Sequence, residues 1–168
     1  APISPPIAVT SGPTAQIDVE LAFVSDKGGG DKVVVAWTDA SDAEGGVAIA
    51  TVDPKTRSAS QAVRVSPPAA DAALVGLWAP ARGADRALLA WELGDVARAD
   101  GERAFTIVTV DATGKVSDTR ATLPFVGLGR PDIVADGDGF AALVLAKVRL
   151  AGEAAGGDAP IWPAYVRF

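Results

Sequence analysis

The chain has 168 residues, 49% of them hydrophobic and 21% charged, which excludes wholesale disorder and fits a single domain over residues 1–168. Because it contains no cysteine and no histidine, disulfides, cysteine-ligated zinc and Ser-His-Asp or Cys-His catalysis by this chain alone are excluded. The net charge of −6 argues against nucleic-acid binding, which favours a basic surface.

The N-terminal residues suggest processing. The chain opens with Ala1-Pro2-Ile3 and has no methionine, so we expect that residue 1 is not a translation start. Removal of a signal peptide after a small residue would produce such an N-terminus, as would other proteolysis. We therefore expect a secreted, periplasmic or cell-surface protein. Apolar runs stay well short of the roughly 18 residues that a membrane-spanning helix needs, so we expect no membrane span.

Short apolar stretches separated by turn residues run along the whole chain, and apolar stripes at helical spacing are nearly absent. We therefore predict an all-β fold. The predicted strands, in chain order, are Ile17–Val24, Val33–Trp37, Val47–Val52, Ala62–Ser66, Leu74–Trp78, Leu88–Trp91, Ala104–Val110, Thr119–Phe125, Pro131–Ala135, Phe140–Ala146 and Ile161–Phe168. They fall into three antiparallel units, approximately residues 14–66, 67–125 and 126–168, with four strands in each of the first two and three in the last.

An internal repeat relates these units. The segment Asp31–Trp37 reappears as Asp85–Trp91, 54 residues later, and a further step of 54 reaches Leu145. Repeats of this length are typical of solenoids, propellers or arrays. The segment Pro6–Pro13 resembles the end of the first unit, so we expect residues 1–13 to be an outer strand that closes the last unit.

The second strand of each unit is predicted to be interior. Val33–Trp37 and Leu88–Trp91 are apolar without alternation, which favours strands covered on both faces. We expect Trp37, Trp78 and Trp91 to be buried between sheets. The fourth strands alternate only partly or contain a proline, which indicates an outer edge.

Three short motifs resemble those of β-propeller blades of the YVTN type in bacterial secreted proteins. They are the Val-Asp turns at Val52–Arg57 and Val110–Val116, whose aspartates we expect to cap local backbone donors, and the connection at Arg130–Phe140. The resemblance implies three blades, whereas propellers typically have about four to eight. It therefore implies either two copies in a six-bladed ring or one segment of a longer propeller. A β-sandwich of two stacked sheets is the alternative architecture.

Acidic loops and late aromatic residues are the candidate binding sites. The candidate ligand-binding residues are Asp39, Asp42, Glu44, Asp95, Asp100, Trp162 and Tyr165. Converging carboxylates are able to bind calcium or to hydrolyse a glycoside, and solvated loops are the alternative interpretation. Trp162 and Tyr165 would stack on a sugar or anchor a partner, unless they belong to an edge strand.

Asp136 and Asp138 are weak candidates for a calcium site, because they stand at alternate positions in an Asp-Gly-Asp-Gly stretch. The same stretch is a strong hairpin-turn signal, and the remaining ligands of an EF-hand are missing. We expect no cofactor, with calcium as the one candidate ion.

These observations favour a non-enzymatic, exported interaction or assembly module that binds a protein partner or another copy of itself. The alternative is a glycan-binding or calcium-dependent recognition domain. A carboxylate-based hydrolase is the third hypothesis, and it requires two carboxylates about 5–9.5 Å apart in a cleft.

Overall fold

The computed structural model describes residues 5–10, 15–28, 30–40, 45–67, 72–81, 83–93, 102–117, 121–126, 132–136, 139–147 and 161–167. Within these ranges the chain is all-β, with antiparallel pairing and no helix. It follows that no described helix is long and apolar enough to cross a membrane. The expected all-β, antiparallel class is confirmed.

The first sheet contains the strands of the first predicted unit. Its members are β1 (Gln16–Asp26), β2 (Gly30–Asp39), β3 (Gly46–Asp53), β4 (Ser58–Ala59) and β5 (Val63–Arg64). They are ordered β1-β2-β3-β4, and β5 also pairs with β3. The single fourth strand expected here is thus two short pieces, which pair with opposite ends of β3.

The second and third sheets follow in the same way along the chain. The second sheet has the order β6 (Ala72–Trp78), β7 (Arg86–Leu93), β8 (Glu102–Asp111) and β9 (Ala121–Val126). The third has the order β10 (Asp132–Asp136), β11 (Gly139–Lys147) and β12 (Ile161–Arg167). Each sheet therefore joins strands that are neighbours in sequence, one sheet to each expected unit.

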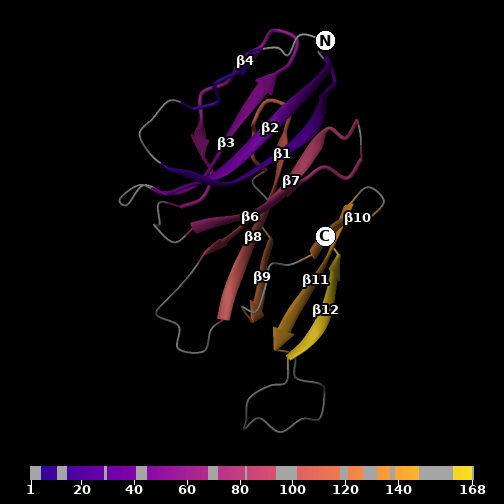
Figure 1. Ribbon diagram of the computed structural model, residues 1–168. Helices are drawn as coiled ribbons and strands as arrows, with labels where there is room; N and C mark the ends of the chain where they lie inside the picture. The colour runs from indigo at the N-terminus through magenta and orange to yellow at the C-terminus, as the bar shows by residue number, and fades with distance from the viewer. Residues whose placement is uncertain are drawn as a thin grey trace, which may run out of the picture.

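The three sheets are stacked, and the second lies between the first and the third (Figure 1). One buried cluster joins the first and second sheets; it includes Val24, Val34 and Ile49 from one side and Leu77, Leu89 and Trp91 from the other. A second cluster joins the second sheet to the third, through residues such as Leu88, Phe105, Ile133 and Phe140. Face-to-face packing of this kind also fits the β-sandwich alternative.

The middle strand β7 is covered on both faces, as its continuous apolar sequence predicted. Leu89 and Trp91 pack against the first sheet, whereas Leu88 and Ala90 pack toward the third. Alternating side chains of one strand thus contribute to two different cores, because successive residues of a strand point to opposite faces. Trp91 is buried between sheets, as expected, and Trp78 is only half-buried. Trp37 is also buried, but on the other face of the first sheet, where it packs with Val9 and not between two sheets.

The structure corrects the register of the third repeat. A constant spacing of 54 makes Leu143 equivalent to Leu89, which is buried against the preceding sheet. In the structure Ala142 packs against the preceding sheet and Leu143 is 53% exposed. The structural spacing between the second and third units is therefore an odd number rather than 54, and Leu143 faces the same way as Leu88 and Ala90. A shift of one residue exchanges the two faces of a strand.

Residues 5–10 lie against the first sheet, and the described strands of the third sheet are β10, β11 and β12. The described part, residues 5–10, contains no strand. The carbonyl oxygen of Pro5 accepts a hydrogen bond of 2.6 Å from Arg57 Nη2, and Val9 packs against Trp37 and its neighbours on β3. Residues 5–10 thus cover the β3 side of the first sheet, a placement that differs from the outer strand expected for the last unit.

Candidate functional site

Most of the acidic candidate residues lie outside the described residues. They are Asp42, Glu44, Asp95, Asp100 and Asp138. Asp39 is half-buried at the end of β2, where it pairs in register with Gln16 and Gly46. Among the described residues, no group of three or more carboxylates is arranged to hold a metal ion. The calcium and hydrolase hypotheses therefore stay predictions.

The candidates of the third sheet are only partly described. Trp162 stands opposite Ala146 in β12, and Asp136 stands opposite Gly139 at the end of β10; their side chains lie outside the described part. Tyr165 is 66% exposed and stands opposite Leu143. Since directly opposed residues share a face, Tyr165 and Leu143 lie together on the third sheet's surface away from the second sheet.

The large apolar side chains that the structure leaves exposed lie on only two of the three sheets. They are Ile17, Val19, Leu21, Phe23 and Val63 in the first sheet, and Val134, Leu143 and Tyr165 in the third. The second sheet has none among the side chains that the structure describes. Exposed apolar residues in a contiguous group mark surfaces that bind other molecules.

We call the surface of the first sheet that faces away from the second sheet its outer face. It carries Leu21 and Phe23 of β1, which are more than half exposed and stand opposite Val35 and Val33 of β2. The alternate residues Ala22 and Val24 point the other way and are buried against the second sheet. The apolar side of an amphipathic strand thus lies open, and the side with smaller residues is buried.

The third sheet has an outer face as well, defined by Val134, Leu143 and Tyr165. Each of these side chains is more than half exposed. Val134 pairs with Ala141 in the hairpin of β10 and β11, and Leu143 pairs with Tyr165 in β11 and β12. The outer face therefore spans all three strands of this sheet, so both ends of the stack present apolar groups.

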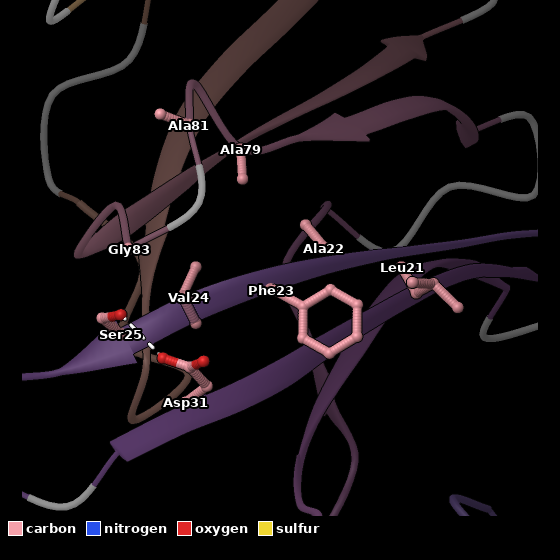
Figure 2. A pocket seen from close by; sticks show the side chains of 9 residues that line it. All are labelled: Leu21, Ala22, Phe23, Val24, Ser25, Asp31, Ala79, Ala81 and Gly83. Atoms are coloured by element: carbon pink, nitrogen blue, oxygen red, sulfur yellow. Dashed lines mark hydrogen bonds between the residues drawn. The ribbon is translucent and has the colours of Figure 1, made fainter.

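A hollow of about 550 Å³ opens beside the edge strand β1 (Figure 2). It is lined by β1 residues 21–25, by Asp31 of β2, and by Ala79, Ala81 and Gly83 of the loop after β6. The Phe23 ring and Leu21 lie on one side of β1, and Ala22 lies on the other, toward Ala79 (Figure 2). The hollow is mostly apolar, so it extends the outer face around the edge of the sheet.

One polar pair and one backbone bond organise this hollow. The Ser25 hydroxyl donates a hydrogen bond of 2.9 Å to Asp31 Oδ1, across the β1–β2 pair. The Ser25 backbone N–H donates to the carbonyl oxygen of Ala84 at 2.7 Å, which ties β1 to the second sheet. The wall formed by β1 is therefore fixed relative to the loop that faces it.

Matching aspartates close the turns after β3 and β8. Asp53 Oδ1 accepts hydrogen bonds from the backbone N–H groups of Lys55 and Thr56, at 2.8 and 3.2 Å. Asp111 Oδ1 accepts from the backbone N–H groups of Thr113 and Lys115, at 2.8 and 3.0 Å. These are the capped turns that the two Val-Asp motifs predicted, because a turn aspartate satisfies local backbone donors.

The electrostatic environment of the two turn aspartates differs. A hydrogen bond from Lys32 Nζ, with further bonds from the turn, holds the pKa of Asp53 well below its usual range. For Asp111, partial burial raises the pKa, but hydrogen bonds from the Thr113 side chain and from the Lys115 and Thr113 backbone outweigh it and lower the pKa overall. Both carboxylates are consequently structural anions of their turns.

The comparisons with known proteins add no family. We found no protein-family model that matches this chain, and no curated protein or solved structure that matches it significantly. The resemblance to propeller blades therefore rests on its short motifs and stays a prediction.

The outer face of the first sheet was missed at the sequence level, although a signal for it exists. Residues 19–23 alternate between large apolar and other residues, with Val19, Leu21 and Phe23 at the odd positions. A register shift between Ile17 and Glu20 places Ile17 opposite Thr38 instead, so Ile17 is not part of this face. Such alternation predicts a strand with one face covered. The structure shows that residues 5–10 cover the β3 side of this face and leave its β1 side open. The alternation is thus a signal for an exposed apolar strand face.

Proposed function

We propose that the chain is a β-propeller-like interaction or assembly module whose outer faces bind a protein partner or another copy of the chain. The contrast between the sheets carries this proposal. The second sheet is covered on both faces, whereas the first and third sheets each keep an apolar face open. An uncovered face of this composition favours association, because burial of apolar surface is worth about 25 cal/mol per Å².

The arrangement of the first strands supports the propeller-like part of the proposal. Strand β6 of the second sheet contacts both β1 of the first and β10 of the third. In a propeller the sheets are arranged around a central channel, with the first strand of each blade nearest to it. The convergence of β1, β6 and β10 fits that geometry, as does a stack of three sheets rather than the two of a plain sandwich.

The absence of catalytic residue types was the reason to favour a non-enzymatic role, and that role stays a proposal. The export of the protein likewise rests on its N-terminal residues and has no support from the fold. The described hollow beside β1 is apolar with Asp31 as its carboxylate, which suits the binding of an apolar protein segment better than acid–base chemistry.

A site-specific crosslinking experiment tests the proposal. A photo-reactive phenylalanine analogue is placed at Phe23, and a control is placed at Val63, an equally exposed residue of β5 that pairs with Ile49 away from the outer face. The purified chain and a lysate of the source cells are both irradiated. We expect a discrete protein adduct from position 23 and none from position 63. An absence of adducts from position 23 in both samples would contradict the proposal.

A further inference from the structure

We infer that the occupant of each outer face is a second copy of this chain. The outer face of the first sheet would pack on the outer face of the partner's third sheet, and the reverse contact would form at the same time. Two chains would then make a ring of six sheets around a two-fold axis. This inference rests on the proposed function and names the partner of the same surfaces.

The first sheet's outer face repeats a surface that is buried inside the chain. Leu21 pairs with Val35, as Leu77 of the second sheet pairs with Leu89. Val35 and Leu89 are equivalent by the repeat spacing of 54, so Leu21 and Leu77 occupy equivalent positions. Leu77 is 5% exposed beneath the first sheet, whereas Leu21 is 58% exposed. The outer face of the first sheet is therefore equivalent to the face of the second sheet that the first sheet covers. Among the described strands, no preceding sheet covers the outer face of the first sheet.

The outer face of the third sheet is equivalent to the faces of the first and second sheets that a following sheet covers. Leu143 points away from the preceding sheet, as does Leu88 of the second sheet, and Val34 likewise points away from the first sheet's outer face. Leu88 packs toward the third sheet and Val34 packs toward the second; both are at most 3% exposed. Leu143, with the same facing, is 53% exposed. Leu88 and Val34 are covered by a following sheet, and Leu143 has no following sheet over it in the described part of the chain.

The two complementary outer faces thus lie on one chain but at opposite ends of its stack of sheets (Figure 1). A second copy of the chain would supply a partner for each of them. In a two-fold dimer, contacts between different surfaces occur in pairs, so both junctions close and no apolar face is left over. Six sheets fall within the range of four to eight that closed propellers use. The new junctions would continue the packing already present between the first and second sheets.

Complementary charge variants of the full chain test this arrangement. Leu21→Glu alters the first sheet's outer face, and Leu143→Lys alters the third's. We expect the wild-type chain to have the mass of two chains by light scattering, and each variant alone to have the mass of one. Mixing the variants should restore the two-chain mass, because one junction then joins Glu to Lys and the other is wild type.

Val63→Glu is the matched control, because Val63 is as exposed as Leu143 but lies on neither outer face; it should keep the two-chain mass. Circular dichroism checks that each variant is folded. A one-chain mass for the wild type at about 100 µM would overturn the inference, as would a Leu143→Lys variant that still dimerises, which indicates pairing of two first sheets. If crosslinks from position 23 nevertheless reach another protein, the proposed function survives and only the second copy is excluded.

Discussion

The hydroxyl oxygen of Thr38 accepts a hydrogen bond of 2.8 Å from the backbone N–H of Leu74, and this bond joins the first sheet to the second. Both residues are buried. Apolar packing between sheets is non-directional, whereas a buried hydrogen bond is directional and costly to leave unmade. The bond therefore fixes where β2 lies against β6, and with it the orientation of both outer faces.

Removal of the Thr38 hydroxyl should destabilise this junction. Thr38→Val keeps the size of the side chain but leaves the Leu74 N–H buried without its acceptor. We expect a loss of about 1–3 kcal/mol in the free energy of unfolding, measured by urea denaturation. Thr38→Ser keeps the hydroxyl and should lose clearly less. A Thr38→Val variant as stable as the wild type would show that methyl packing, not the hydrogen bond, matters.

Gly76 should not tolerate a side chain. An added methyl group there would overlap the six-membered ring of Trp78, which packs against the buried cluster shared with the third sheet. Gly76→Ala is expected to cost about 1–3 kcal/mol through overpacking. Gly28→Ala is the control, because nothing lies within 4 Å of an added methyl there. Thermal denaturation of both variants checks the difference, and similar melting temperatures would refute it.

Acid should weaken the turn after β3. The pKa of Asp53 is lowered in the folded chain, so its contribution to stability is fully present above the ordinary aspartate value of about 3.9. That contribution is lost as the pH falls below this value toward the folded pKa. Lys32→Met removes the largest cause of the shift and should raise the pKa of Asp53. Carboxyl NMR titrations of both proteins check this; a wild-type midpoint at or above 4 would contradict it.

Two phenylalanines should differ sharply in their effect on stability. Phe105 is 1% exposed in the core between the second and third sheets, and Phe23 is 55% exposed on the outer face. We expect about 3–5 kcal/mol of destabilisation for Phe105→Ala. Phe23→Ala should cost less than about 1 kcal/mol at protein concentrations too low for association. A comparable loss for Phe23→Ala under those conditions would mean that the chain covers the outer face itself.

The positions of the strands could be predicted from the sequence because the pattern within each strand is local. The continuous apolar run Leu88–Trp91 correctly predicted a strand covered on both faces, and the Val-Asp motifs correctly predicted capped turns. What the pattern could not supply was the register of the third repeat. Ala142 and Leu143 are both apolar, so hydrophobicity alone does not decide which of them points toward the second sheet.

The sequence pattern also could not predict where a segment lies when its position depends on contacts with distant parts of the chain. The segment Pro6–Pro13 resembles the end of the first unit, but the position of its described part depends on contacts with residues far along the chain, such as the bond from Arg57 to Pro5. Whether the outward side chains of β1 are exposed depends on which other segments cover them, and the sequence of β1 alone does not determine that. The acidic loop candidates other than Asp39 lie outside the described residues, so the structure adds nothing to their interpretation.

The pairing of each sheet from consecutive stretches of chain has a consequence for folding. All described strand pairs form within a unit, so each sheet can complete its backbone hydrogen bonds before the next unit is synthesised. The stability of such an array is approximately a sum of unit terms and nearest-neighbour terms. The second sheet has two neighbours and each end sheet has one. Amide exchange should therefore be slowest in β7 and fastest at the two ends, with unfolding that proceeds inward.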